Sequence, residues 1–167
     1  MKARKIALWG VMGALTLAIC FLENLWELPF LPPGARPGFS NIVTVLAALT
    51  VGIGGIFYLT ALKVLFALLT RGVTACLMSL AGGILSGGLT ALLLKGSRRP
   101  FSLFGVAIAG ACAHNAGQLA MACFLTQTGA VWLYGPILLV FSLISGAITG
   151  TILRLAAPYC IKEYQKL

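Results

Sequence analysis

The sequence contains no aspartate, only three glutamates and a single histidine. Mg²⁺ sites are built largely from carboxylates, and structural zinc sites need four Cys or His ligands. The five cysteines show no C-x-x-C or other metal-ligand spacing. The phosphate-loop pattern G-x-x-x-x-G-K-[ST] is missing as well, which excludes ATP hydrolysis through that loop. We therefore expect no metal, no cofactor and no catalytic activity from this chain on its own.

Charge is scarce in general. Charged residues make up 9% of the chain, hydrophobic residues make up 60%, and the mean hydropathy is +1.02. Soluble domains carry roughly 25% charged residues, so a soluble fold could not cover its surface with this composition. The sequence predicts an integral membrane protein of one domain, residues 1–167. With about 20 residues per span, five to seven helices fit into this length.

The net charge of +9 could indicate a nucleic-acid partner, but the positions of the cations argue against it. Most of them lie at the termini and in one loop, next to the ends of apolar runs. These cations are Lys2, Arg4, Lys5, Lys95, Arg98, Arg99, Lys162 and Lys166. With six helices, both termini and this loop share one side, which the positive-inside rule makes the cytoplasm.

Apolar runs and their breaks predict an all-α bundle of six transmembrane helices. The expected helices cover residues 5–28, 41–51, 56–70, 73–94, 101–126 and 136–157. The second and third are the shortest, and they could form a bent hairpin or be partly re-entrant. The start of the chain is read as a retained first helix, because no small-residue cleavage site follows its apolar stretch.

The stretch "PPGARPGFSN", residues 32–41, connects the first two predicted helices on the outer side. Its prolines restrict the backbone, and its glycines allow sharp turns. A stiff loop of this kind loses little entropy on closing, which suits a preformed lid over a pocket. Arg36 either reaches down into that pocket or remains in water.

Lys63 and Glu23 are charged residues that lie inside predicted helices. Lys63 is eight residues before Arg71, about 12 Å along a helix axis, which is too deep for a simple interface anchor. A charge at this depth costs about 2.5–3.5 kcal/mol on insertion scales, so it usually faces a cavity or a partner. Glu23, near the outer end of the first helix, is the natural partner for Lys63 or Arg36. Lys63 is therefore expected in a ligand site, in an ion pair with Glu23, or in both.

The motif "AHNAGQ", residues 113–118, places three polar side chains in the middle of the fifth predicted helix. His114 and Gln118 share one face, and Asn115 lies to one side of it. Such residues either line a polar cavity or join helices by hydrogen bonds. Combined with the cations, they predict an outward-facing pocket for a small, anionic and partly apolar molecule. The predicted binding residues are Glu23, Arg36, Asn41, Lys63, Arg71, His114, Asn115 and Gln118.

Small residues recur at four-residue spacing in three helices. Gly10, Ala14 and Ala18 form such a stripe in the first helix, and glycine pairs 83/87 and 146/150 do so in the fourth and sixth. Stripes of this type allow close helix packing, either inside the bundle or against a partner. The interpretation as a partner-docking face fits the first helix best.

These motifs resemble the Gx transporter family, also called heptaprenyl diphosphate synthase component I. The pattern P-G-A-(K/R)-x-G-x-x-N is matched by Pro33, Gly34, Ala35, Arg36, Gly38 and Asn41. The pattern A-H-N-x-G-Q is matched by Ala113, His114, Asn115, Gly117 and Gln118. The resemblance runs from about Glu23 through the fifth helix. The family often has Arg where this chain has Lys63, and Leu where it has Pro37.

The resemblance implies a fold and two possible roles, and a third role stays open independently of it. The family is similar to the substrate-binding S components of energy-coupling-factor (ECF) transporters, which have six helices, an external lid loop and a small-residue face that docks a transmembrane partner. It thus implies an uptake component in a bacterial cytoplasmic membrane, binding an isoprenoid or quinone precursor or a vitamin-like molecule, with ECF-type transmembrane and ATPase subunits as partners. A second role is a non-catalytic membrane subunit of heptaprenyl diphosphate synthase, in menaquinone side-chain synthesis. A third is a structural subunit of a membrane redox assembly.

Overall fold

The computed structural model describes residues 2–25, 36–95 and 101–165. Within these ranges it contains six α-helices, one short 3₁₀ helix and no strand. The helices are α1 (Lys2–Leu25), α2 (Asn41–Thr50), α3 (Ile53–Arg71), α4 (Val73–Leu94), α5 (Leu103–Thr126), the 3₁₀ helix η1 (Gly129–Tyr134) and α6 (Gly135–Gln165). All of them except α2 and η1 are long and apolar enough to cross a membrane, so the expected multi-pass, all-helical protein is confirmed.

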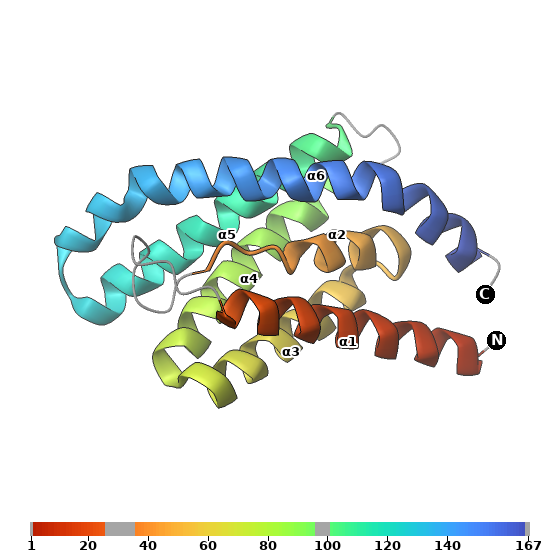
Figure 1. Ribbon diagram of the computed structural model, residues 1–167, viewed down its shortest axis with the longest axis horizontal. Coiled ribbons are helices and arrows are strands. Elements are labelled where there is room, and N and C mark those ends of the chain that lie inside the picture. Colours follow the sequence, from red (N-terminus) through yellow and green to blue (C-terminus); the bar gives the residue numbers. More distant parts are fainter. Residues whose placement is uncertain (1, 26–35, 96–100, 166–167) are drawn as a thin grey trace.

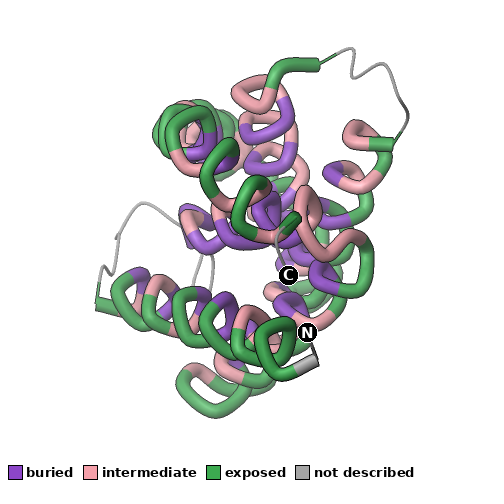
Figure 2. The backbone as a smooth tube through the Cα atoms, turned by 90° about the vertical axis from the view of Figure 1, so that its right-hand side faces the viewer, coloured by how far each residue is buried: buried purple, intermediate pink, exposed green. Residues whose placement is uncertain are grey.

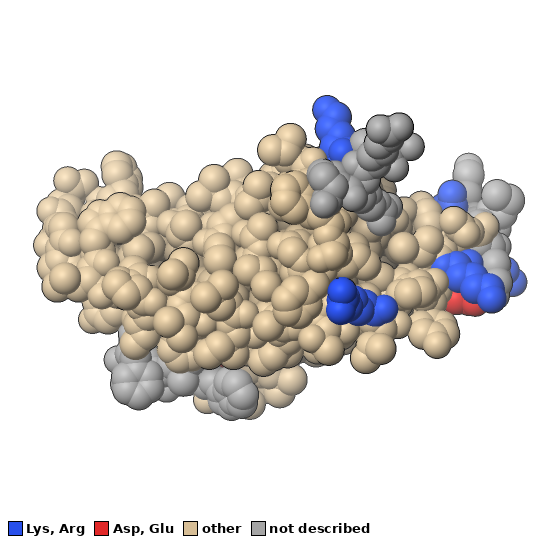
Figure 3. Space-filling view, turned by 90° about the horizontal axis from the view of Figure 1, so that it is seen from above, with Lys and Arg blue, Asp and Glu red and all other residues tan. Residues whose placement is uncertain are grey.

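The helices run roughly along one long axis, and both ends of the chain lie at the same end of the molecule (Figure 1). The sequential pairs α3–α4, α4–α5 and α5–α6 pack against each other, whereas α1 contacts only α2 and α3 among the described elements. Lys and Arg visible in Figure 3 lie in the half nearer the termini, and the other half of that face shows none. The molecule thus has a basic end and an end without exposed charge on this face.

Helix α2 lies at the centre of the bundle. Val45 and Leu46 belong to one buried cluster with residues of α5 and α6. Val43 and Ala47 belong to another with Met12 of α1 and Leu59 of α3. At 10 residues, α2 is about 15 Å long, which is half of a hydrocarbon core. The expectation that this element is short agrees with the structure, whereas α3, also expected to be short, has 19 residues and is long enough to span.

Helix α3 begins at Ile53, three residues before residue 56, where the sequence analysis predicted its start. A tight turn connects it to α2. The amides of Val51 and Gly52 both donate to the carbonyl oxygen of Ala47, and Gly52 has φ +82°, a conformation that favours glycine. Gly55 is then free to pack on α2, since an added Cβ would lie 3.0 Å from the Cβ of Ala47. The glycine-rich stretch 51–55, which the sequence analysis interpreted as a break between helices, therefore forms a tight helix–helix contact.

Helix α6 extends beyond residue 157, its predicted end, to Gln165. Pro158 lies inside the helix, where its ring removes one backbone hydrogen bond and commonly causes a bend. Figure 1 shows α6 bending toward its C-terminal end. Helix α1 spans Lys2–Leu25, and the predicted continuation to residue 28 lies outside the described residues.

The glycine pairs of α4 and α6 pack inside the bundle. A Cβ on Gly146 would lie 2.7 Å from the Cα of Ile108, and one on Gly150 would lie 2.7 Å from the Phe104 ring. A Cβ on Gly83 would lie 2.7 Å from the Thr60 side chain. These pairs allow the close approach of neighbouring helices, so their role is internal packing.

Candidate functional site

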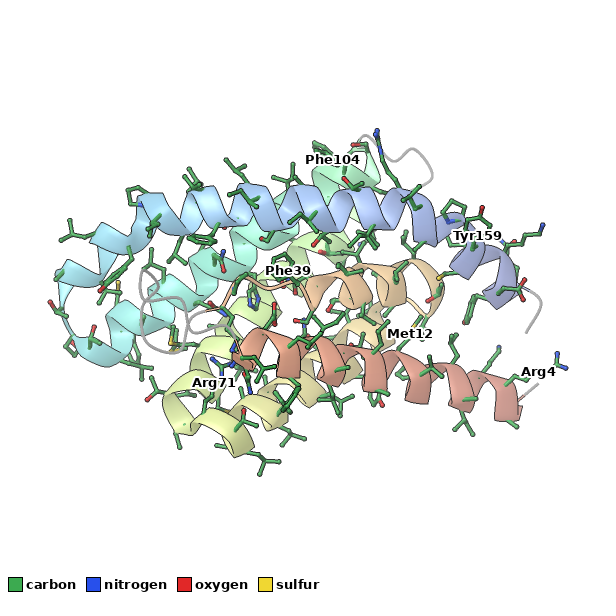
Figure 4. The ribbon with its side chains drawn as sticks, viewed as in Figure 1. Arg4, Met12, Phe39, Arg71, Phe104 and Tyr159 are labelled. Atoms are coloured by element: carbon green, nitrogen blue, oxygen red, sulfur yellow. The ribbon has the colours of Figure 1, made fainter. Side chains whose placement is uncertain are left out.

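A small polar cavity lies in the half of the molecule away from the termini. It is formed by α1, the segment 36–40, α3, α4 and α5, and its volume is about 20 Å³, room for about one water molecule. Its lining residues are Cys20, Glu23, Arg36, Ser40, Lys63, Phe66, Arg71, Ser79, His114 and Gln118. Figure 4 shows Phe39 and Arg71 in this half, with Arg71 beside the C-terminal end of α1.

Lys63 is the most deeply placed cation of the cavity, with 5% of its surface exposed. Its ammonium group donates to Asn41 Oδ1 at 3.0 Å and to Thr44 Oγ1 at 2.9 Å. Both acceptors are neutral and belong to α2. They satisfy hydrogen bonds of the ammonium group, but they do not compensate its charge.

Glu23 holds the segment that covers the cavity. The carboxylate is buried, and its Oε1 accepts a hydrogen bond from the backbone N–H of Phe39. Glu23 and Lys63 line the same cavity, yet their hydrogen bonds go to different elements, the segment 36–40 and α2. The predicted proximity of these two charges is therefore present, and the carboxylate also acts as an acceptor for the loop backbone.

Arg36 fastens the same segment at two further points. Its Nη1 donates to the carbonyl oxygen of Cys20 in α1 at 2.8 Å, and its backbone N–H donates to Gln118 Oε1 in α5 at 3.0 Å. Only 9% of the residue is exposed, so the alternative in which Arg36 remains in water is wrong. Burial lowers the pKa of the Arg36 guanidinium from its ordinary value, and the neighbouring Glu23 carboxylate raises it.

His114 and Gln118 form the floor beneath this segment. Because Gln118 Oε1 accepts from Arg36, its amide nitrogen faces His114 Nε2, at 2.9 Å. The amide donates in this pair, so Nε2 is the acceptor and the neutral imidazole carries its proton on Nδ1. Gly38 has φ +81°, and an added Cβ would lie 3.0 Å from His114 Cδ2 and 3.1 Å from Asn41 Nδ2. The backbone at Gly38 thus needs glycine for its conformation and for its contact with His114.

Asn115 lies apart from the other predicted residues. Its amide nitrogen donates to Ser142 Oγ of α6 at 2.8 Å, and it does not line the cavity that contains His114. Neighbouring residues on a helix are about 100° apart, which turns Asn115 toward α6. The structure therefore brings seven of the eight predicted binding residues to the cavity or to Lys63, and it separates Asn115 from them.

The cavity and the contacts of Lys63 also include residues that the sequence did not single out. Thr44 is a partner of Lys63, and its position three residues after Asn41 on one helix face was a usable signal. Cys20 contributes its backbone carbonyl, which no sequence pattern reveals. Ser79 of α4 and Phe66 of α3 complete the wall.

The stripe of Gly10, Ala14 and Ala18 lies on the outer side of α1. All three residues are exposed, and a Cβ added to Gly10 would meet nothing within 4 Å. The opposite side of the helix faces the bundle, where a Cβ on Gly13 would lie 2.7 Å from the Tyr58 hydroxyl. Figure 2 shows this division along α1, with buried residues on one side and exposed ones on the other. In contrast to the glycine pairs of α4 and α6, this stripe has no packing role within the described chain.

The sequence was compared with protein families, curated proteins and solved structures. A family model described as heptaprenyl diphosphate synthase component I matches residues 12–155. No curated protein and no solved structure matches the chain. The matched range contains most of the chain, including both motifs and every residue of the cavity.

Proposed function

The chain belongs to the heptaprenyl diphosphate synthase component I family, and from this premise we propose that it is a membrane component that binds a small, anionic and partly apolar molecule. Component I is a non-catalytic subunit, so the expectation that the chain is not an enzyme on its own is confirmed. The family implies a partner subunit of the synthase.

The observation that carries this proposal is the position of Lys63. Its charge is buried in a membrane-spanning helix, its hydrogen bonds go to neutral oxygens, and Arg36 lines the same cavity. Glu23 is the acidic residue of the cavity in the described part of the chain, so three cations, Arg36, Lys63 and Arg71, face one buried carboxylate. An anionic group bound beside Lys63 would compensate the positive charge that Glu23 does not balance. A site with a purely structural role would not need an unbalanced positive charge next to a cavity.

The proposal includes a movement of the segment 36–40. At about 20 Å³ the cavity is smaller than an organic molecule needs, so binding requires the segment to move outward. The hydrogen bonds that hold it closed include those from Arg36 to Cys20, from Arg36 to Gln118 and from Phe39 to Glu23. Each joins the segment to a helix that lines the cavity, as expected of a lid that opens and closes as one piece.

The exposed side of α1 supports a role for a membrane partner. Small residues let a second helix approach closely, and no described element of the chain covers this side. In an uptake complex of ECF type the partner is a transmembrane subunit with its ATPases. In a synthase complex the partner is a membrane-facing part of the synthase. We place both termini in the cytoplasm, in a bacterial cytoplasmic membrane, because the basic end of the molecule carries them.

Native mass spectrometry of the protein released from its own membranes tests the binding role. The proposal predicts an adduct of defined mass that is negatively charged when released and that contains an apolar portion. A protein that carries only bilayer phospholipid, in every preparation, would contradict a dedicated binding site.

A further inference from the structure

A second pocket lies on the side of α5 that faces α6. Its volume is about 240 Å³, and it is formed by α5, η1 and the first turns of α6. Its walls are mostly apolar, with Leu119 and Leu138 buried and Trp132 and Leu139 more than half exposed. Helices α5 and α6 are long and apolar enough to cross a membrane, so their exposed sides face lipid. The pocket between them therefore opens toward the lipid.

Asn115 is a buried polar residue in the wall of this pocket, and its hydrogen bonds determine which polar atom remains without a partner. It is 2% exposed, and its amide nitrogen lies 2.8 Å from Ser142 Oγ and 3.5 Å from the carbonyl oxygen of Leu138. The Ser142 hydroxyl donates to that same carbonyl, so its oxygen accepts from Asn115. The two acceptors fix the orientation of the amide, since reversing it would bring two carbonyl oxygens together.

The carbonyl oxygen of Asn115 is left without a hydrogen-bond partner in the described part of the chain. Buried polar atoms almost always have a partner, and this atom can only accept. A bond between α5 and α6 needs only the amide nitrogen and Ser142, so joining the helices does not explain the free acceptor. The adjoining space is also far larger than one water molecule requires.

We propose that this pocket binds a neutral amphiphile that enters from the bilayer and donates a hydroxyl or N–H group to Asn115 Oδ1. The apolar part of the molecule lies against Leu119, Trp132 and Leu139. A neutral ligand follows from the walls, because no charged side chain of the described residues lines the pocket. This site is separate from the Lys63 cavity, and it does not depend on the function proposed above.

Trp132 provides a direct reading of occupancy, because bromine quenches tryptophan fluorescence on contact. The full chain with Trp9→Phe and Trp26→Phe is placed in phosphatidylcholine vesicles, whose lipid has no hydroxyl or N–H donor. It is titrated with 10-bromo-1-decanol and, separately, with the methyl ether of that alcohol. At equal amounts in the bilayer, the alcohol is expected to quench Trp132 at roughly tenfold lower concentration, as one hydrogen bond to a buried acceptor would give.

Three variants assign that preference to the pocket. Asn115→Leu is expected to make the alcohol and the ether equal, and Ala116→Phe, which fills the pocket, is expected to weaken both. Ala120→Phe is the matched control, because Ala120 is also exposed on α5 but lines a different groove, and it is expected to keep the preference. Should Asn115→Leu fail to fold, the alcohol–ether comparison and the two phenylalanine variants still decide.

Equal quenching by the alcohol and the ether in the parent protein would overturn the proposal, and so would a preference that persists in Asn115→Leu. A second set of vesicles with added diacylglycerol, an uncharged lipid whose glycerol headgroup has a free hydroxyl donor, identifies the source of the ligand. Competition with the alcohol indicates a lipid headgroup, and no competition indicates a free amphiphile.

Discussion

The charged side chains of the cavity are held by partners of two different kinds. Lys63 is fixed by neutral oxygens of α2, whereas Glu23 and Arg36 are fixed by backbone groups of the covering segment and of α1. The first arrangement positions a cation without neutralising it. The contacts of Glu23 and Arg36 couple the position of the segment 36–40 to the positions of the charged groups in the cavity. In the function proposed above, binding of an anion beside Lys63 would thus be linked to movement of this segment through shared contacts.

Gly38 is the residue at which this coupling is most sensitive to a small change. Gly38→Ala adds a Cβ that meets His114 and Asn41 at a φ of +81°, so it disfavours the closed segment by strain and by contact. We expect faster dissociation of the bound anion together with a loss of about 1–2 kcal/mol in stability. Stopped-flow dissociation and thermal unfolding measure the two effects.

Gly72→Ala is the matched control for that substitution. Gly72 has φ +84°, but an added Cβ there would meet nothing within 4 Å. It should therefore cost similar stability and leave dissociation unchanged. Equal dissociation rates in both alanine variants would show that the closed segment does not control the ligand.

Sequence reasoning was most successful for the residues whose chemistry is unusual in a membrane. Lys63, Glu23 and His114 are charged or titratable groups inside apolar runs, and they do line one cavity. Asn115 was grouped with them because it is adjacent in sequence, but adjacent positions on a helix face different neighbours. Which neighbour lies on each side depends on the packing of α5 against α6, and that information is not contained in the motif itself.

The segment 36–40 and the helix α1 are the two elements with functional predictions of their own. The segment carries backbone and side-chain donors to α1 and α5, so it acts as a clamp across the cavity. Arg36→Ala removes the side-chain bond to Cys20 but keeps the backbone bond to Gln118. We expect ligand dissociation to be several-fold faster, as loss of one hydrogen bond of a charged group would give.

A loop with Pro33 and Pro37 changed to Ser provides a second test of the same element. Pro37 is buried, and Pro33 lies outside the described residues. Greater backbone freedom raises the entropy that closing must overcome, so dissociation should again be faster. Unchanged rates in both Arg36→Ala and the proline variant would mean that the segment is a connector only.

The outer side of α1 is predicted to contact a membrane partner. Ala14→Trp places a large side chain in the middle of the stripe, and it should prevent co-purification of the partner subunit while ligand binding stays intact. Ala61→Trp is the control, because Ala61 is exposed on α3, outside the stripe. Co-purification that is equally strong in both variants would exclude α1 as the docking face.

A stability comparison separates this stripe from the internal ones. Gly146→Ala brings a methyl group to within 2.7 Å of Ile108 Cα, where only backbone movement can relieve the contact. It should cost about 1–3 kcal/mol, as overpacking usually does. Gly10→Ala meets nothing and should cost little or stabilise α1. Thermal unfolding in detergent measures both, and equal losses would contradict the different roles.

The lengths of the elements were only partly readable from the sequence. The short α2 was expected because its apolar run is bounded by Ser40 and by glycines. The start of α3 was missed because the glycine-rich stretch 51–55 was treated as a break, although Gly54 and Gly55 pack against Trp9 and Ala47 within the helix. The end of α6 was missed because the residues after 157 were treated as a short polar tail, although the helix continues through Pro158.

The molecule as a whole has two unlike ends. One end carries both termini and the exposed cations, and the other contains the buried cavity beneath the segment 36–40. Composition predicted the membrane, and the expected number of six helices predicted that both termini lie at the same end. The central position of α2 could not be predicted, because an apolar helix of this length gives no sign of which neighbours surround it.

Binding of an anion that depends on the buried Lys63 is the central claim, and native mass spectrometry of two variants beside the parent protein tests it most directly. Lys63→Met keeps the length of the side chain and removes its charge, while Lys95→Met removes an exposed charge after α4. The account predicts that the parent protein and Lys95→Met carry the same anionic adduct and that folded Lys63→Met has lost it. An adduct that remains on Lys63→Met at the level of the parent protein would contradict the account.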